Sequence, residues 1–254
     1  MAKIKAVFFD QDGVIIDTER DGHRVAFNQT FKDFDYDFEW DVAYYHELLQ
    51  VAGGKERMKH HLRTQGFGVE VKPEEVDDLI IRMHKHKTAV FVGLIESGDL
   101  PLRPGVKRLM KEVNDAGLIL GVCTTSNERA AQAVVGGMLR EIKFELVLAG
   151  DIVDNKKPDP EIYNLALEKT GVKPEECVVI EDSRNGILAA AAAGLNIVAT
   201  TNIYTASENL SDADIIVTSL GDPEGEKGTL KKGGEGLDYD GVLRLDQLLV
   251  YFSK

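Results

Sequence analysis

The alternation of short apolar runs with helix-like segments restricts the fold of this chain more than any other feature. After the first run at 3–9, apolar runs recur at 118–123, 144–149, 177–180, 195–199 and 214–217. Each is long enough for a buried strand and too short for a helix, and helical spacing lies between several of them. The pattern predicts an α/β fold, a parallel sheet covered by helices on both faces.

The first apolar run ends in a pair of carboxylates and a glycine, Asp10-Gln11-Asp12-Gly13. Like charges this close repel each other unless a cation or a shared proton holds them. Gly13 permits a tight turn that most residues would resist. The stretch fits a hard divalent cation on carboxylate oxygens, with one Asp free to attack an electrophile.

Two other interpretations of this stretch have to be weighed. Asp and Gly are common in plain turns for backbone reasons alone, so the stretch by itself does not decide between a turn and a catalytic site. A calcium loop of the EF-hand type would need an acid or amide at position 14 and Gly at 15. Val14 and Ile15 exclude that loop.

Polar residues follow four of the apolar runs where each run ends. They are Asp10 and Asp12, Thr124 and Thr125, the loop leading to Lys156 and Lys157, and Glu181 and Asp182. In parallel sheets, functional sites lie at the carboxyl ends of the strands. Taken singly, Thr124 fits a helix cap and Lys157 a solvated charge, but the complete set favours a catalytic site.

Residues 18–91 contain little strand signal and show helical spacing at 24–31, 42–49 and 76–83. We interpret 18–96 as a small all-α domain inserted into a core of 1–17 plus 97–254. The glycines and prolines of 93–104 predict the return linker. A second glycine-rich stretch, 221–241, predicts a mobile surface loop.

Several His and aromatic residues of the inserted segment have ordinary structural interpretations. His60, His61 and the stretch 84–87 lack acidic or Cys partners at metal-site spacing, so we expect them on solvated helix faces. We expect Trp40, with Phe38, Tyr44 and Tyr45, in the core of the inserted domain.

Composition excludes several classes of function. A formal net charge of −13 argues against nucleic acid or anionic membrane as partner. Cys123 and Cys177 lie in apolar runs and form neither a disulfide framework nor a zinc pattern. The N-terminal residues do not resemble a targeting peptide, and no apolar run reaches membrane-spanning length. We expect a cytoplasmic protein.

The four polar sites, in this order, resemble the motifs of the haloacid dehalogenase (HAD) superfamily: Asp10-x-Asp12-Gly13, Thr124, Lys157-Pro158 and Glu181-Asp182. The resemblance covers essentially the whole chain. It implies a doubly wound, parallel-sheet HAD-like core with an inserted all-α cap. The stretches 17–24 and 53–57 further resemble the CbbY-type phosphatases, which remove a phosphate from xylulose 1,5-bisphosphate.

The resemblance implies a Mg²⁺-dependent phosphatase that forms an aspartyl-phosphate. Asp10 would attack phosphorus, and Asp12 would protonate the leaving group and later activate water. The implied Mg²⁺ site consists of the Asp10 and Asp182 carboxylates and the Asp12 backbone carbonyl, with Glu181 orienting the metal's waters.

The resemblance also implies the residues that meet the substrate. Thr124 and Lys157 would stabilise the transferring phosphoryl oxygens. The other implied substrate-binding residues are Thr125, Ser126 and Asn127 in the core and Glu19, His23, Gly53, Gly54, Lys55 and Arg57 in the cap. Lys55 and Arg57 would hold a second phosphate, although an ordinary basic first turn of a helix would look the same.

We therefore expect an enzyme, a monomeric phosphatase, whose partner is a small phosphorylated sugar. A hexose phosphomutase resembling β-phosphoglucomutase, or a phosphoglycolate phosphatase, would share the motifs. Some relatives use the fold as a regulatory binding module. That use requires loss of the nucleophile, whereas Asp10 and Asp12 are both present.

Overall fold

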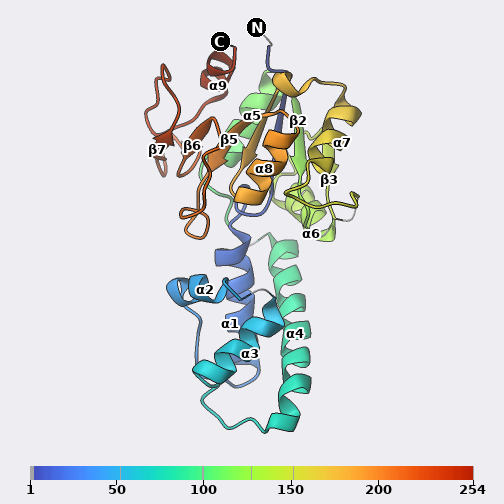
Figure 1. Ribbon diagram of the computed structural model, residues 1–254, viewed down its shortest axis with the longest axis vertical. Coiled ribbons are helices and arrows are strands. Elements are labelled where there is room, and N and C mark those ends of the chain that lie inside the picture. Colours follow the sequence, from blue (N-terminus) through green and yellow to red (C-terminus); the bar gives the residue numbers. More distant parts are fainter. Residues whose placement is uncertain (1–2, 52, 99, 127, 151, 254) are drawn as a thin grey trace. The chain divides into compact units, whose positions relative to one another are not determined.

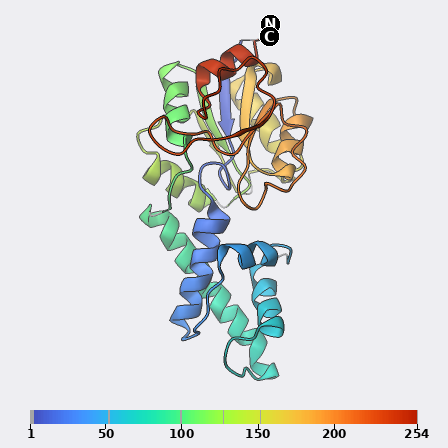
Figure 2. The ribbon, with the colours of Figure 1, turned by 90° about the vertical axis from the view of Figure 1, so that its left-hand side faces the viewer.

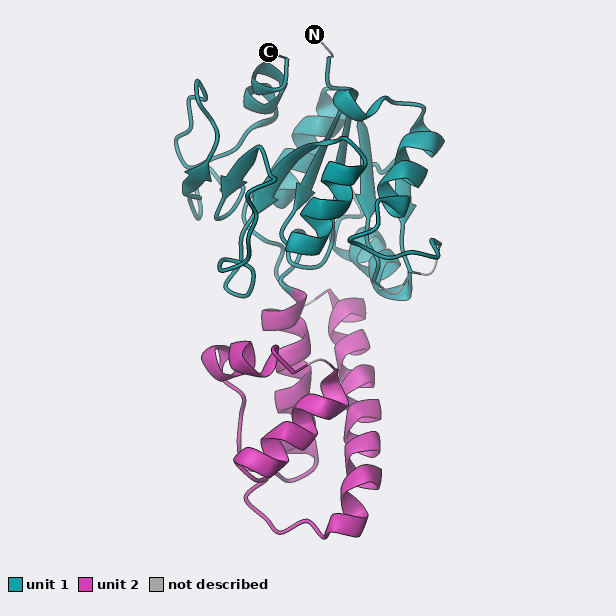
Figure 3. Cartoon of the chain, viewed as in Figure 1, with its two compact units in different colours: residues 1–17, 101–254 teal, residues 18–100 magenta. Residues whose placement is uncertain are grey.

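The structure, a computed structural model, describes residues 3–51, 53–98, 100–126, 128–150 and 152–253. The chain forms two compact units, Met1–Asp17 with Pro101–Lys254 and Thr18–Leu100 (Figure 3). The assignment of 18–96 as a cap that serves a catalytic core stays a prediction.

The described strands of the first unit form one seven-stranded sheet in the order β3-β2-β1-β4-β5-β6-β7 (Figure 1). Its strands are β1 Ala6–Phe9, β2 Ile119–Cys123, β3 Leu146–Leu148, β4 Cys177–Glu181, β5 Asn196–Thr200, β6 Ile215–Val217 and β7 Leu230–Lys232. All neighbouring pairs are parallel except β6 and β7. The predicted parallel α/β sheet is confirmed.

Helices cover both faces of this sheet. They are α5 Val106–Asp115, α6 Glu128–Ala133, α7 Glu161–Thr170, α8 Arg184–Ala192 and α9 Leu245–Tyr251. Figure 2 shows α7 and α8 on one face, in yellow and orange, and α5 and α9 on the other, in green and red. Because both faces are covered, every residue of β1 and β4 is buried, which explains the apolar runs 6–9 and 177–180.

The register of the central strands determines where the polar residues meet. Phe9 of β1 pairs with Val122 of β2 on one side and with Ile180 of β4 on the other. The three strands therefore end at the same level, and the residues that follow them share one edge of the sheet. Asp10 thus comes next to the end of β2 and the end of β4.

The second unit is helical, as the sequence predicts. Its helices are α1 Arg24–Asp33, α2 Val42–Leu48, α3 Gly54–Thr64 and α4 Val76–Ser97, with a π-helical segment at Thr18–His23 and a 3₁₀ turn at Pro73–Glu75. Trp40 and Tyr45 are fully buried. The ring centroid of Trp40 lies 4.8 Å from those of Phe27 and Phe31, so these rings form the core of the unit.

Two sequence-based boundaries were wrong. The return linker does not begin at Gly93, because α4 continues to Ser97 and ends at Gly98 in the left-handed conformation. Ile95 is buried, so the apolar face of α4 continues past Gly93. The stretch 221–241 is not only a loop, since it contains β7, which pairs with β6 at the edge of the sheet.

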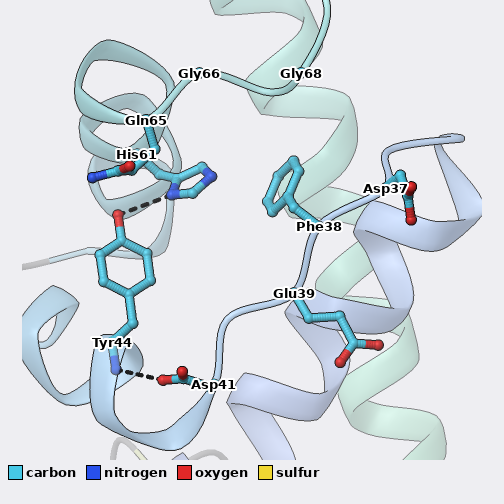
Figure 4. Close-up of a pocket in the computed structure, with 9 residues that line it drawn as sticks. All are labelled: Asp37, Phe38, Glu39, Asp41, Tyr44, His61, Gln65, Gly66 and Gly68. Carbon is cyan, nitrogen blue, oxygen red and sulfur yellow. Dashed lines mark hydrogen bonds between the residues drawn. The ribbon is translucent and has the colours of Figure 1, made fainter.

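The expectation of a solvated His61 was also wrong. His61 is 5 % exposed and packs among aromatic rings, with Phe38 4.6 Å away between centroids. Its Nδ1 lies 2.9 Å from the Tyr44 hydroxyl, beside a pocket of about 510 Å³ (Figure 4). Burial lowers the pKa of His61 to about 4, so the ring is neutral at pH 7. His60, by contrast, is exposed as expected.

Among the described residues, no helix combines the length and the hydropathy that crossing a membrane requires.

The aromatic core yields a stability prediction. Phe31→Ala removes a fully buried ring and should lower the free energy of unfolding of the helical unit by about 3–5 kcal/mol. Trp40 is the only tryptophan and touches this ring, so its fluorescence can follow the transition in urea. Ile81→Ala, at a residue 57 % exposed, is the control and should change stability by only about 0.5 kcal/mol. If the two variants unfold at the same urea concentration, Phe31 does not belong to the core of the helical unit.

Candidate active site

A buried lysine lies between two carboxylates at the carboxyl edge of the sheet. Lys157 Nζ donates to Asp10 Oδ1 at 2.6 Å, to Glu181 Oε1 at 2.7 Å and to the Cys123 carbonyl at 2.9 Å. The side chains of Lys157, Asp10 and Glu181 are only 8 %, 10 % and 1 % exposed. Residues 147 positions apart in the sequence thus form one enclosed charge cluster.

The cluster holds more negative charge than Lys157 can neutralise. Burial, together with the carboxylates of Glu181 and Asp12, raises the pKa of Asp10 to about 8 despite the opposing effect of Lys157. Burial likewise raises the pKa of Asp182, with Glu181 and Asp10 adding to the shift. Burial alone would lower the pKa of Lys157, but the two adjacent carboxylates outweigh it and raise the pKa.

Both oxygens of Glu181 are occupied by protein donors. Oε1 accepts from Lys157 and from the Tyr163 hydroxyl, the latter at 2.6 Å, and Oε2 accepts from the Asp182 backbone N–H at 3.1 Å. A Cβ at Gly186 would overlap the Glu181 carboxylate, so this position in α8 needs glycine. Glu181 therefore positions its neighbours, and its oxygens are less available to a metal ion than those of Asp10 and Asp182.

The carboxylates fit a divalent metal ion. Asp10, Glu181 and Asp182 are buried, and each offers a carboxylate oxygen within 4.8 Å of the other two. Among the described residues, no other group of three or more Asp, Glu, His or Cys side chains is placed closely enough to hold a metal ion. Oxygen ligands and uncompensated negative charge suit Mg²⁺. The group is therefore a candidate site for a divalent cation.

The turn after β1 is held by contacts to two other segments, the loop after β2 and Arg103. The Ser126 hydroxyl donates a hydrogen bond to Asp12 Oδ2, and Ser126 N–H donates to Thr124 Oγ1 at 3.1 Å. Gly13 has a φ of 82°, which favours glycine, and its carbonyl accepts from Arg103. The structure thus brings Ser126, which is hydrogen-bonded to Thr124, to the side of Asp12.

The two adjacent lysines of the predicted site, Lys156 and Lys157, have different surroundings. Lys156 is exposed and its Nζ donates to the Thr125 carbonyl at 3.3 Å, whereas Lys157 takes the buried position beside Asp10. Asn127 lies outside the described residues.

In the helical unit, two of the predicted substrate residues, Glu19 and Arg57, share one hydrogen-bond partner. Tyr45 donates to Glu19 Oε2 at 2.7 Å and accepts from Arg57 at 3.3 Å. His23 Nδ1 lies 2.7 Å from Lys87 Nζ. Lys55 is exposed in the first turn of α3, after Gly53 with its φ of 91° and Gly54.

Lys87 contradicts the expectation that the stretch 84–87 is solvated. It is 7 % exposed, and its Nζ lies 4.7 Å and 5.0 Å from the ring centroids of Phe27 and Phe91. Burial lowers the pKa of Lys87 to about 8, although the Glu19 carboxylate opposes the shift. A buried lysine on an amphipathic helix carries no sequence signal that separates it from its solvated neighbours.

Three further residues of the sheet unit escaped the sequence analysis. Tyr163 belongs to an apolar helix pattern and was indistinguishable from a core residue. Arg103 donates to the carbonyls of Gly13, Thr200, Thr201 and Thr218, although its position was assigned to a linker. Asn202 donates to Asp182 from a loop that matches none of the four motifs.

Comparison with known proteins identifies the family. Residues 4–194 match the haloacid dehalogenase-like hydrolase family. The CBBY-like protein of Arabidopsis thaliana is 46 % identical over 87 % of this chain and 71 % of that protein. Protein CbbY of Cereibacter sphaeroides is 41 % identical over 89 % of this chain and 96 % of its own length.

A solved structure agrees with these matches. The crystal structure of a CbbY variant from Rhodobacter sphaeroides in complex with xylulose 1,5-bisphosphate superposes with a TM-score of 0.63 at 40 % identity, over 85 % of this chain and 94 % of that one. The predicted fold class, family resemblance and enzyme class are confirmed. The chain belongs to the haloacid dehalogenase-like hydrolase family, as an enzyme of the phosphatase class that is similar to CbbY.

Proposed function

We propose that this protein is a Mg²⁺-dependent phosphatase of a small sugar bisphosphate, with xylulose 1,5-bisphosphate as its substrate, and that it forms an aspartyl-phosphate on Asp10. The observation that carries the proposal is the buried Asp10 carboxylate, bound by Lys157 and grouped with Asp182. The substrate is supported by the CbbY relative, whose structure contains that sugar bisphosphate.

Asp10 acts as the nucleophile in this proposal. A carboxylate is a weak nucleophile, so it depends on positioning more than on activation. Lys157 provides that positioning, because its bond to Oδ1 restricts rotation of the Asp10 side chain. The same ammonium group lies where it can offset the negative charge of a phosphoryl group attached to Asp10.

Asp12 acts as the general acid and base. It is half-buried and lies two residues after Asp10, so it can donate a proton to the leaving group of the substrate that Asp10 attacks. The hydrogen bond from Ser126 to Oδ2 orients its carboxylate. Thr124 and the backbone N–H of Thr125 are proposed to bind the phosphoryl oxygens beside it.

The metal site is proposed to comprise the Asp10 and Asp182 carboxylates and the Asp12 backbone carbonyl. When bound, Mg²⁺ supplies positive charge and a fixed orientation to the transferring phosphoryl group. Glu181 contributes indirectly, since it fixes Lys157 and the Asp182 backbone through its two oxygens.

The second phosphate is assigned to the helical unit. Arg57 is held by the Val51 carbonyl at 3.0 Å and lies 5.8 Å from the Tyr45 ring centroid, so its guanidinium is fixed in place. Lys55, with the amides of Gly53 and Gly54, is proposed to complete the phosphate site. Glu19 and His23 are proposed to contact the sugar hydroxyls.

A substrate screen tests the proposed function. The purified protein with Mg²⁺ should release inorganic phosphate from xylulose 1,5-bisphosphate faster than from hexose monophosphates or phosphoglycolate. Chelation should stop the release, and added Mg²⁺ should restore it, because the carboxylate group then regains its cation. Isomerisation of a hexose phosphate without net phosphate release would instead indicate a mutase.

Two Asp variants serve as controls for that screen. Asp10→Asn keeps the size of the side chain but removes the nucleophile, so phosphate release should disappear. Asp115→Asn, at an exposed residue paired with Lys111, should retain normal activity. Equal activities in the two variants would remove Asp10 from its proposed role.

The second-phosphate site is tested by Lys55→Ala. Loss of a charge-assisted contact worth about 1.5–3 kcal/mol should raise KM for the bisphosphate roughly 10- to 100-fold. KM for para-nitrophenyl phosphate, which has a single phosphate, should stay nearly constant.

Lys59→Ala is the matched control, since Lys59 lies on the same helix and pairs with Asp77. It should leave both KM values unchanged. If Lys55→Ala raises the two KM values equally, the assignment of Lys55 to the second phosphate is wrong.

A further inference from the structure

The loop after β5 places an asparagine against the buried carboxylate of Asp182. Asn202 Nδ2 donates to Asp182 Oδ2 at 2.8 Å. Asp182 is only 5 % exposed, so this contact lies inside the protein, next to the group of three carboxylates. The amide is neutral and therefore supplies a donor without adding a cation that would compete with a metal ion.

The orientation of the Asn202 amide is fixed by its own turn. Its Oδ1 accepts from the backbone N–H groups of Tyr204 and Thr205, at 2.9 Å and 3.1 Å. Two N–H donors must face an oxygen, so the nitrogen of the amide has to point to Asp182. The Asn202 N–H also donates to Thr205 Oγ1 at 3.2 Å, which closes the turn.

The backbone of Gly13 packs closely against the same carboxylate oxygen, Asp182 Oδ2. A Cβ built on Gly13 would overlap Asp182 Oδ2 and would lie 2.9 Å from Asn202 Nδ2. Asp182 Oδ2 is therefore packed against the backbone and bound by the amide. The other oxygen, Oδ1, is the one left for a cation.

We propose that Asn202 is a positioning residue for the metal site: it binds Asp182 through Oδ2 and thereby assigns Oδ1 to the divalent cation. The inference rests on the metal site of the proposed function. Residues that orient metal-binding side chains in this way typically contribute 10- to 100-fold to affinity or activity.

Direct metal binding tests this role. Asn202→Ser removes the donor to Asp182, while the Ser hydroxyl can still accept a hydrogen bond within the turn. Calorimetric titration of the whole protein with Mn²⁺ alone should give roughly 10- to 100-fold weaker binding than the wild type. The Mg²⁺ concentration for half-maximal phosphate release should rise in parallel, with kcat at saturating Mg²⁺ changed only a few-fold.

Asn209→Ser provides the matched control. Asn209 also accepts a backbone N–H, that of Ser211 at 3.1 Å, but it is exposed and not in contact with Asp182. It should bind Mn²⁺ as tightly as the wild type. Wild-type Mn²⁺ affinity in Asn202→Ser, or a fall in kcat with unchanged metal affinity, would overturn the proposal.

A second measurement needs no variant. A crystal structure of the wild type with Mn²⁺, located by anomalous scattering, should place the ion on Asp182 Oδ1 with the Asn202 bond to Oδ2 retained. An ion bound to Oδ2, or no ion at this site, would contradict the inference. Because the Mn²⁺ titration and the crystal structure use the metal without substrate, a protein that binds Mn²⁺ as expected yet hydrolyses no sugar phosphate would refute only the proposed function.

Discussion

The contact of Lys157 with Asp10 and Glu181 is the constraint on which the rest of the site depends. Three buried charges are costly to remove from water, and loss of one partner from a buried ion pair typically costs about 3–5 kcal/mol. The arrangement is held by the register of β1 with β4 and by the chain that leads into α7. The fold thus places Lys157 beside Asp10, although the two residues are 147 positions apart in the sequence.

The surplus of negative charge around this lysine explains the neighbouring residues. Tyr163 and the Asp182 N–H each satisfy an oxygen of Glu181, and Gly186 makes room for its carboxylate. Gly13 allows Asp182 to approach the turn after β1. These residues hold carboxylates close together against their mutual repulsion, an arrangement that a divalent cation would stabilise.

The sequence predicted the parts of the fold that depend on local pattern. Apolar runs of strand length and the polar residues that end them predicted the sheet, and the order of the motifs led to the family. The predicted site residues Asp10, Lys157, Glu181 and Asp182 lie together in the structure.

The features that escaped prediction depend on contacts between distant parts of the chain. Lys87 and His61 carry the same polar signal as solvated helix residues, and only the packing of aromatic rings around them reveals their burial. Strand β7 is three residues long and pairs at the edge of the sheet, which gives a weak local pattern. Asn202 acts through a hydrogen bond to a residue 20 positions away.

The central claim is that Asp10, held by Lys157, accepts the phosphoryl group. The most direct measurement is a crystal structure of the protein with Mg²⁺ and beryllium trifluoride, which mimics a phosphoryl group on a carboxylate. We expect beryllium bonded to an Asp10 oxygen, Lys157 Nζ within hydrogen-bond distance of the trifluoride, and Mg²⁺ on Asp10 and Asp182. Beryllium on Asp12 or on any other side chain would contradict it.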